Sequence, residues 1–207
     1  HSVAFFIEPF FQHHDRAQFE LVAYSSTRHP DATTARLKAS TVLWRETPNL
    51  NDLQLAKQIH DDRIDIAIDL AGHTLGNNLP AFSLRPAPVQ VTYCGYPDTT
   101  GLRQIDYRIV DSHTDPPTPE VDRRASEKLW RLDPCFLCYR PPAEAPAPAR
   151  EPGPITFGSF NALAKLNDDL LGLWARILAS VPDSRLCLKS VHVKGEPERA
   201  PLAARIL

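Results

Sequence analysis

Three loops of the chain carry residues suited to binding a ligand, and each loop follows a segment with the pattern of a β-strand. An imidazole and a hydroxyl exchange hydrogen bonds with a ligand, glycine lets a backbone approach closely, and lysine attracts an anion. The strands are expected to end near Leu70, Cys94 and Phe160. Because ligands of open α/β sheets bind beyond the carboxyl ends of strands, chemistry is expected in these loops. Their candidate residues are His73, Thr74, Gly95, Tyr96, Pro97 and Lys165.

Each candidate also has an ordinary structural interpretation. Gly95 and Pro97 suit any tight turn, and Lys165 could be a solvated surface lysine. Asp69 is a possible base by its chemistry, but it lies opposite the isoleucines of its strand and could serve only to orient the following loop. His1 precedes a predicted helix, where an imidazole can face a ligand at the positive helix end.

Several common catalytic and metal-binding patterns are absent from the sequence. It has no Gly-x-Ser-x-Gly elbow, which argues against a serine hydrolase of that kind. It has neither a Gly-x-Gly-x-x-Gly nor a Walker-type phosphate loop, which disfavours dinucleotide enzymes and NTPases. Cys135 and Cys138 have the spacing of a zinc knuckle, but no second Cys/His pair completes a four-ligand set, so structural thiols are favoured over zinc.

Composition excludes further classes of function. The net charge is −2 with mixed signs along the chain, so neither nucleic acid nor an anionic membrane is an expected partner. The sequence has no apolar stretch of about 18 residues and no signal-peptide pattern at its start. Four cysteines without a disulfide pattern fit a reducing compartment, and the cytoplasm is the expected location.

The apolar pattern alternates between strands and helices over the first two thirds of the chain. This alternation predicts parallel strand pairs with helical crossovers, and hence a doubly wound α/β sheet. In the strand 64–70 the isoleucines and Leu70 lie on one side and Asp65, Ala67 and Asp69 on the other. Helices are expected at 2–13, 31–40, 53–59 and 79–84, and strands at 19–24, 41–44, 64–70, 89–94, 107–110 and 128–132.

A proline-rich segment, 140–154, predicts a semi-rigid linker, because its prolines prevent a regular helix or strand ladder. The α/β pattern then restarts with strands at 155–160 and 184–188. Asn167 is expected to cap a helix from Asp168 to Ser180, and another helix to start near residue 196. The helix 168–180 has an apolar stripe expected to be buried, made of Leu170, Leu173, Trp174, Ile177, Leu178 and, just beyond its end, Val181.

These boundaries give three parts: a Rossmann-like domain over 1–139, the linker 140–154, and the start of a second Rossmann-like domain over 155–207. The chain starts at His1, contains no methionine and stops within a helical pattern at Leu207. Both domains are therefore expected to be truncated, and the chain is interpreted as an internal piece of a longer protein.

Nine motifs, in a fixed order along nearly the whole chain, carry a more specific signal. They are His1–Phe6, Asp69–Asn78, Leu84–Val91, Gly95–Leu102, Ile105–Tyr107, Ser126–Leu129, Phe157–Lys165, Trp174–Leu178 and Val181–Leu186. Together they resemble the bacterial relatives of protein O-linked N-acetylglucosamine (O-GlcNAc) transferase, the SPINDLY-like proteins of glycosyltransferase family 41. Two α/β halves joined by a proline-rich connection also suit the two-domain architecture called GT-B.

The resemblance implies an inverting transferase that moves N-acetylglucosamine from UDP-GlcNAc to Ser or Thr hydroxyls of proteins. It implies no metal and no other cofactor, and it implies tetratricopeptide (TPR) helical repeats upstream of His1. A chain of this length is expected to be inactive alone. Two alternatives stay open: a related GT-B transferase with another nucleotide sugar or acceptor, and a non-catalytic module that binds peptides.

The resemblance also assigns roles to individual residues. His1 matches a histidine beside the donor sugar, and Lys165 matches a lysine that contacts the UDP diphosphate, where a fixed cation would stabilise the charge that builds on the leaving group. His73 and Thr74 are expected to contact an acceptor peptide or a sugar, but this expectation comes from their place at a strand's carboxyl end and not from the resemblance. Ala162 stands where many members have Gln or Asn, which would weaken donor binding by about 1 kcal/mol. Asp98 replaces a frequent glycine. The expected donor-binding residues are Gly95, Tyr96, Pro97, Asn161, Ala162 and Lys165.

Overall fold

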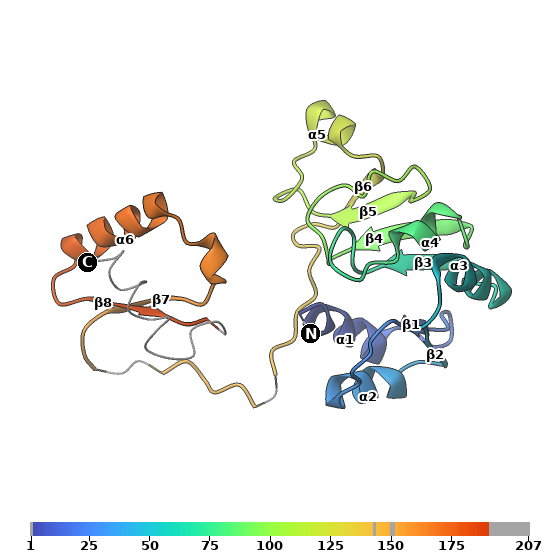
Figure 1. Ribbon diagram of the computed structural model, residues 1–207, viewed down its shortest axis with the longest axis horizontal. Coiled ribbons are helices and arrows are strands. Elements are labelled where there is room, and N and C mark those ends of the chain that lie inside the picture. Colours follow the sequence, from blue (N-terminus) through green and yellow to red (C-terminus); the bar gives the residue numbers. More distant parts are fainter. Residues whose placement is uncertain (1, 143, 150–151, 191–207) are drawn as a thin grey trace. The chain divides into compact units, whose positions relative to one another are not determined.

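The computed structural model describes residues 2–142, 144–149 and 152–190. The chain divides into two compact units, His1–Ala145 and Pro146–Leu207, and each is described here by itself. The division falls within the segment 140–154, whose described residues form neither helix nor strand (Figure 1). The domain limits drawn from the sequence stay a prediction.

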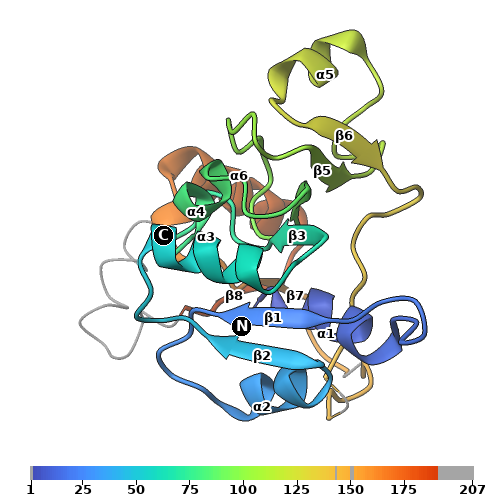
Figure 2. The ribbon, with the colours of Figure 1, turned by 90° about the vertical axis from the view of Figure 1, so that its right-hand side faces the viewer.

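The first unit alternates helices and strands, and all of its strand pairs are parallel, as the sequence predicts. One sheet has the order β1-β2 and the other the order β3-β4-β5-β6. Figure 2 shows α2 on one side of the β1–β2 pair and α3 on the other. The elements are α1 (Ala4–His13), β1 (Val22–Ser25), α2 (Ala32–Ala39), β2 (Leu43–Glu46), α3 (Asp52–Asp61), β3 (Ile66–Asp69), α4 (Leu79–Ser83), β4 (Val89–Tyr93), β5 (Tyr107–Val110), α5 (Pro119–Arg124) and β6 (Lys128–Arg131).

Side-chain caps begin several of these helices. Asp31 and Asn51 each form a capping box, in which the side chain accepts a hydrogen bond from a backbone N–H three residues later. Thr118 caps α5 with a single side-chain hydrogen bond, which its hydroxyl accepts from the Val121 N–H, and Pro119 occupies the first helical position. Helix α5 was not predicted, although a capping threonine followed by proline and glutamate is a signal for a helix start.

Helices α3 and α4 cover one face of the larger sheet. Ala67 of β3 packs with Leu79 and Phe82 of α4 and with Ile105, and Leu55 of α3 belongs to a second cluster beside them. Within this layer the fully buried Gln90 donates from Nε2 to the carbonyl oxygens of Phe82 and Gln104, at 3.0 and 2.8 Å. These contacts fix β4 and the segment before β5 against the helices.

The burial of β3 is the reverse of what its hydrophobicity suggests. Ala67 and Asp69 are buried, whereas Ile66 and Ile68 are each 51% exposed. In the parallel register Ile68 pairs with Val91 of β4, which pairs in turn with Tyr107 of β5. Ile109, two residues after Tyr107, pairs with Trp130 of β6. The same face therefore carries Ile66, Ile68, Tyr107, Ile109 and Trp130, which we call the apolar sheet face.

The first strands of the chain also differ from expectation. The strand expected over 19–24 begins only at Val22, is half-buried, and leaves Phe19 58% exposed. The strand expected over 41–44 is shifted to Leu43–Glu46. Both strands belong to a pair that is not hydrogen-bonded to the larger sheet, so their ends are set by pairing with each other rather than by burial.

The second unit contains β7 (Thr156–Ser159), the 3₁₀ turn η1 (Leu163–Lys165), α6 (Asp168–Ser180) and β8 (Arg185–Leu188). Strands β7 and β8 pair in parallel. Asn167 caps α6 as predicted, because its Oδ1 accepts a hydrogen bond of 2.9 Å from the Leu170 N–H. The helix expected near residue 196 lies outside the described residues.

The apolar stripe of α6 is only partly buried. Leu171, which the sequence analysis left out of the stripe, is the buried residue of the helix, and Leu173 and Ile177 are exposed. Leu170, Trp174, Leu178 and Val181 are half-buried.

Two features of the described residues bear on function. No helix among them has the length and apolarity that crossing a bilayer requires. No group of three or more His, Cys, Asp and Glu side chains in this part of the chain is placed to hold a metal ion. The cysteines of the chain are unpaired: Cys94, Cys135, Cys138 and Cys187.

Candidate functional site

Asp69 ends β3 and shapes the loop that follows it. Its carboxylate is buried and accepts hydrogen bonds from the N–H groups of Ala71 and Gly72, at 3.1 and 2.9 Å. The hydroxyl of Thr92 on the neighbouring strand β4 donates to the same carboxylate at 2.8 Å. With its oxygens taken up in this way, Asp69 orients the loop, which confirms the structural interpretation of this residue.

The loops after β3 and β4 interlock at two glycines. A Cβ on Gly95 would lie 2.0 Å from the carbonyl oxygen of Leu70. A Cβ on Gly72 would lie 2.3 Å from Cβ of Tyr96, and Gly72 has a φ of +52°, which other residues rarely adopt. The close approach at Gly95 is to the Leu70 carbonyl, and it joins the two predicted ligand loops, whereas the approach of this glycine to a ligand stays a prediction.

His73 ties the same two loops together from the outer side. Its Nε2 lies 2.8 Å from the carbonyl oxygen of Thr100. The ring meets that of Tyr96 edge to face, with 5.3 Å between centroids. The structure thus brings His73 beside Tyr96, two residues predicted independently as parts of a site. The hydroxyl of Thr74 donates to the carbonyl of Ala71 at 2.8 Å, so it closes its own turn.

Pro97 is held by a charged pair beneath the turn. Nη1 of Arg108 donates to the Pro97 carbonyl at 3.3 Å, and its Nη2 forms an ion pair with Asp115. Both charged side chains are largely buried. Arg108 of β5 and Asp115 of the following loop therefore support the turn that contains Pro97.

Glu127 also holds the loop after β4, and it was not predicted from the sequence as a functional residue. It directly precedes β6, is 4% exposed, and accepts hydrogen bonds from the Thr100 N–H at 2.7 Å and from the Thr100 hydroxyl. The Thr99 hydroxyl donates to its other oxygen at 2.7 Å. Burial raises the pKa of the Glu127 carboxyl, but the hydrogen bonds from Thr100 and Thr99 outweigh burial and hold that pKa below its ordinary value.

The candidates in the second unit lie around η1. Asn161 and Ala162 precede this turn, and Lys165 is its last residue; all three are exposed. Among the described residues, no hydrogen bond or ion pair engages the Lys165 ammonium, so its charge is available to a ligand. His1 lies outside the described residues, and its role stays a prediction.

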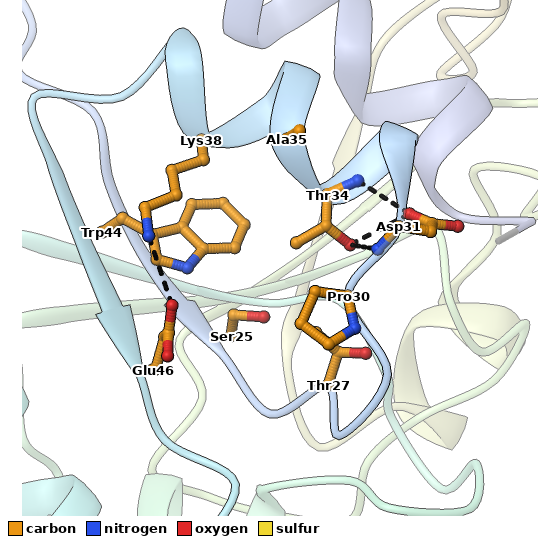
Figure 3. Close-up of a pocket in the computed structure, with 9 residues that line it drawn as sticks. All are labelled: Ser25, Thr27, Pro30, Asp31, Thr34, Ala35, Lys38, Trp44 and Glu46. Carbon is orange, nitrogen blue, oxygen red and sulfur yellow. Dashed lines mark hydrogen bonds and ion pairs between the residues drawn. The ribbon is translucent and has the colours of Figure 1, made fainter.

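A pocket of about 180 Å³ lies at the carboxyl ends of β1 and β2, beside the start of α2. Figure 3 shows Lys38 beside the indole of Trp44, with its ammonium 3.2 Å from a carboxylate oxygen of Glu46. None of the predicted site residues lines this pocket, so it is separate from the edge formed by the loops after β3 and β4. Its lining residues are Ser25, Thr27, Pro30, Asp31, Thr34, Ala35, Lys38, Trp44 and Glu46.

Comparison with known proteins gives consistent matches. The model of the family described as glycosyl transferase family 41 matches residues 1–139. The chain is 45% identical over 197 residues to the Arabidopsis thaliana protein named probable UDP-N-acetylglucosamine–peptide N-acetylglucosaminyltransferase SPINDLY, covering 91% of this chain and 21% of that protein. The Solanum lycopersicum protein of the same name is 46% identical over the same shares. The chain thus spans about a fifth of the length of these relatives.

Two further matches extend the comparison. The Arabidopsis thaliana protein with the corresponding name SEC is 29% identical over 209 residues, covering 95% of this chain and 21% of that protein. Among solved structures, a mutant of the Thermobaculum terrenum O-GlcNAc transferase matches with a TM-score of 0.92 and 37% identity, covering 100% of this chain and 39% of that one. This likeness confirms the predicted α/β fold class of GT-B type.

Proposed function

Because this chain belongs to glycosyl transferase family 41, we propose that its protein transfers N-acetylglucosamine from UDP-GlcNAc to Ser or Thr hydroxyls of proteins. The observation that carries the proposal is the pair of interlocked loops at the carboxyl edge of β3 and β4, where Gly95 packs against Leu70 and His73 lies beside Tyr96. The names of the matched relatives support the donor and the type of acceptor.

The reaction we propose inverts the anomeric carbon and needs no metal. The acceptor oxygen attacks that carbon and gives up its hydroxyl proton to solvent or to a phosphate oxygen of the leaving group. The bond between the carbon and the β-phosphate oxygen breaks at the same time, so negative charge builds on the leaving UDP. A fixed cation stabilises this charge in the transition state, which is the role we assign to Lys165. Its exposure at the end of η1, with no partner among the described residues, leaves the ammonium available for this contact.

The remaining roles follow the two loops and η1. Gly95, Tyr96 and Pro97 form a rigid turn that would present backbone groups to the donor sugar. His73 and Thr74 would contact the acceptor from the loop after β3. Asn161 and Ala162, which precede η1, would contact the donor. His1 would position the donor sugar. TPR repeats elsewhere in the protein would bind acceptors, and the unpaired cysteines support a reducing, cytoplasmic location.

Two residues favour a second candidate, a transferase of the same fold that uses another nucleotide sugar. Ala162 offers no side-chain hydrogen bond to a donor. Asp98 occupies the turn beside Pro97, and its carboxylate accepts a hydrogen bond from the Thr99 N–H at 2.7 Å. An added charge and a missing amide at donor-facing positions would change which sugar or base binds best.

The test is a transfer assay on the full-length protein with a panel of radiolabelled nucleotide sugars and an extract of cell proteins. We expect label from UDP-GlcNAc on protein, unchanged by EDTA, and loss of that label with Lys165→Ala. Transfer from a different nucleotide sugar alone would select the second candidate. Background label with every donor would contradict both and favour a module that only binds peptides.

We also propose that the isolated 207 residues do not turn over substrate. Support comes from the small share of the relatives' length that they span, about a fifth. The assay with this chain alone should give background label, and sustained transfer by it would contradict this proposal.

A further inference from the structure

The contact between His73 and Thr100 fixes where the imidazole carries its hydrogen. A carbonyl oxygen only accepts hydrogen bonds, so Nε2, which lies 2.8 Å from the Thr100 oxygen, must be the donor. In a neutral imidazole the other nitrogen, Nδ1, then has a lone pair and accepts. Among the described residues, none forms a hydrogen bond with Nδ1. His73 is exposed, so this acceptor can reach a ligand.

The ring is also held in orientation. The edge-to-face contact with Tyr96 limits its rotation, at a centroid separation of 5.3 Å. The backbone on which it rests is fixed in turn by Asp69, whose carboxylate holds the N–H groups of Ala71 and Gly72. His73 therefore presents one defined nitrogen in one direction, as a hydrogen-bond acceptor must in order to discriminate between substrates.

Glu127 determines the position of the carbonyl that holds the imidazole. Its carboxylate takes the N–H and the hydroxyl of Thr100 and the hydroxyl of Thr99. The Thr99 hydroxyl also accepts hydrogen bonds from the N–H groups of Ser126 and Gly101, at 3.1 and 3.2 Å. Among the described residues, the hydrogen-bond partners of this buried carboxylate are all neutral donors, and burying a charge among neutral donors costs free energy. Such a group is better explained by a positioning role than by stability.

We propose that Glu127 is a positioning residue that, through the Thr100 carbonyl, holds His73 with Nδ1 directed to accept a hydrogen bond from a substrate hydroxyl. The proposal rests on the transfer reaction proposed above, whose acceptor and donor sugar both carry hydroxyls. The chemistry at Nδ1 is the same for either source, so the experiment has to separate them.

The first test observes the imidazole directly. In full-length protein labelled with ¹⁵N at histidine, and with His73→Gln to assign the signal, His73 should show a protonated Nε2 and an unprotonated Nδ1. Adding an acceptor peptide or a nucleotide sugar should shift the Nδ1 resonance. Finding the hydrogen on Nδ1 would overturn the proposal. An Nδ1 resonance that shifts with neither substrate would overturn it as well. Finding the hydrogen on Nδ1 counts against the proposal whichever nucleotide sugar the protein uses.

The second test separates the two nitrogens by substitution. In His73→Gln the side-chain amide can still donate to the Thr100 carbonyl, but no acceptor remains at the position of Nδ1. His73→Asn places an amide oxygen near the position of Nδ1, but it loses the hydrogen bond to the Thr100 carbonyl. We expect His73→Gln to lower kcat/KM by about tenfold, the effect of one lost hydrogen bond, and His73→Asn to retain more activity. A rise in KM for the acceptor identifies its hydroxyl, and a rise in KM for the donor identifies the sugar.

The third test addresses Glu127. Glu127→Gln keeps the shape of the side chain but places an amide N–H against the hydroxyls of Thr99 and Thr100, which now donate to the carboxylate. The Thr100 carbonyl should then lose its fixed position, so the His73 signal should become a mixture of tautomers and kcat/KM should fall. Thr100→Val is the milder change, and Thr100→Ser should restore the wild-type signal. The exposed His60 serves as the control, since His60→Gln should change neither kinetics nor the His73 spectrum. A wild-type His73 spectrum in both Glu127→Gln and Thr100→Val would refute the positioning role.

Discussion

Gly95 lies directly against the carbonyl group of Leu70: a Cβ at Gly95 would come within 2.0 Å of the Leu70 oxygen and 2.6 Å of its carbon. Both contacts are with backbone, which cannot rotate away as a flexible side chain does. The separation between the loops after β3 and β4 is therefore set by the absence of a side chain at this position.

Replacing Gly95 by alanine should move these loops apart. We expect Gly95→Ala to reduce the free energy of unfolding by about 1–3 kcal/mol, the usual cost of overpacking, and to weaken donor binding as well. Urea denaturation and calorimetry with a nucleotide sugar measure the two effects. Gly172→Ala is the matched control, because a Cβ there meets no atom within 4 Å and alanine favours a helix. Equal stability of Gly95→Ala and wild type would show that the loops adjust freely.

Asp62 links the first strands to α3, and its charge should matter for stability. Arg45 binds its carboxylate through two nitrogens, at 3.1 and 2.5 Å, and the Tyr24 hydroxyl donates to it at 2.8 Å. The hydrogen bonds from Arg45 hold the pKa of Asp62 below its ordinary value of 3.8. Since the folded-state pKa is the lower one, the stabilisation is complete above the ordinary value and is lost as pH falls through the depressed one.

We therefore expect Asp62→Asn to lower stability at neutral pH by about 1–2 kcal/mol, discounted for the partial exposure of Arg45, and to flatten the loss of stability below pH 3.8. Thermal unfolding across pH measures both. The neighbouring Asp61, paired with Lys57 at the surface, provides the control variant Asp61→Asn, which should change the midpoint far less. An equal effect of the two substitutions would contradict the importance of the Arg45–Asp62 pair.

Lys165→Ala should remove transfer by the full-length protein while leaving its folding intact. The lysine is exposed, so its loss removes no packing, whereas loss of a cation at the leaving group typically costs about 10²–10³ in kcat. Circular dichroism and the radiolabel assay report the two properties. Lys57→Ala, at an exposed helical ion pair, is the charge-matched control. Normal turnover in Lys165→Ala would exclude this residue from the mechanism.

Ala162→Asn tests the identity of the donor. If UDP-GlcNAc is the donor, restoring an amide at this position should tighten its binding by about 1 kcal/mol, or roughly fivefold. Calorimetric titration of the full-length protein gives the value, with Ala164→Asn in the same turn as the comparison. Weaker binding of UDP-GlcNAc in Ala162→Asn would favour a different nucleotide sugar.

The parallel strands and the loops at their ends were predictable, because alternation of apolar residues and the position of glycines are local signals. The orienting role of Asp69 was one of two interpretations that the sequence left open, the other being a catalytic base. The role of Glu127 was not, because it depends on a carboxylate meeting Thr100, a residue 27 positions earlier in the chain. The burial of Ala67 and the exposure of Ile68 were missed for a similar reason: which face of a strand is covered depends on where α3 and α4 pack, not on the hydrophobicity of the strand itself.

The apolar sheet face has a consequence for how the molecule behaves in solution. Ile66, Ile68 and Trp130 leave half or more of their accessible surface to water, and they lie on β3 and β6, the two edge strands of the described sheet. Contact of another apolar surface with these side chains would release the water that now covers them. A hydrophobic dye added to this chain is therefore expected to bind at the apolar sheet face, as dyes do at other exposed apolar patches.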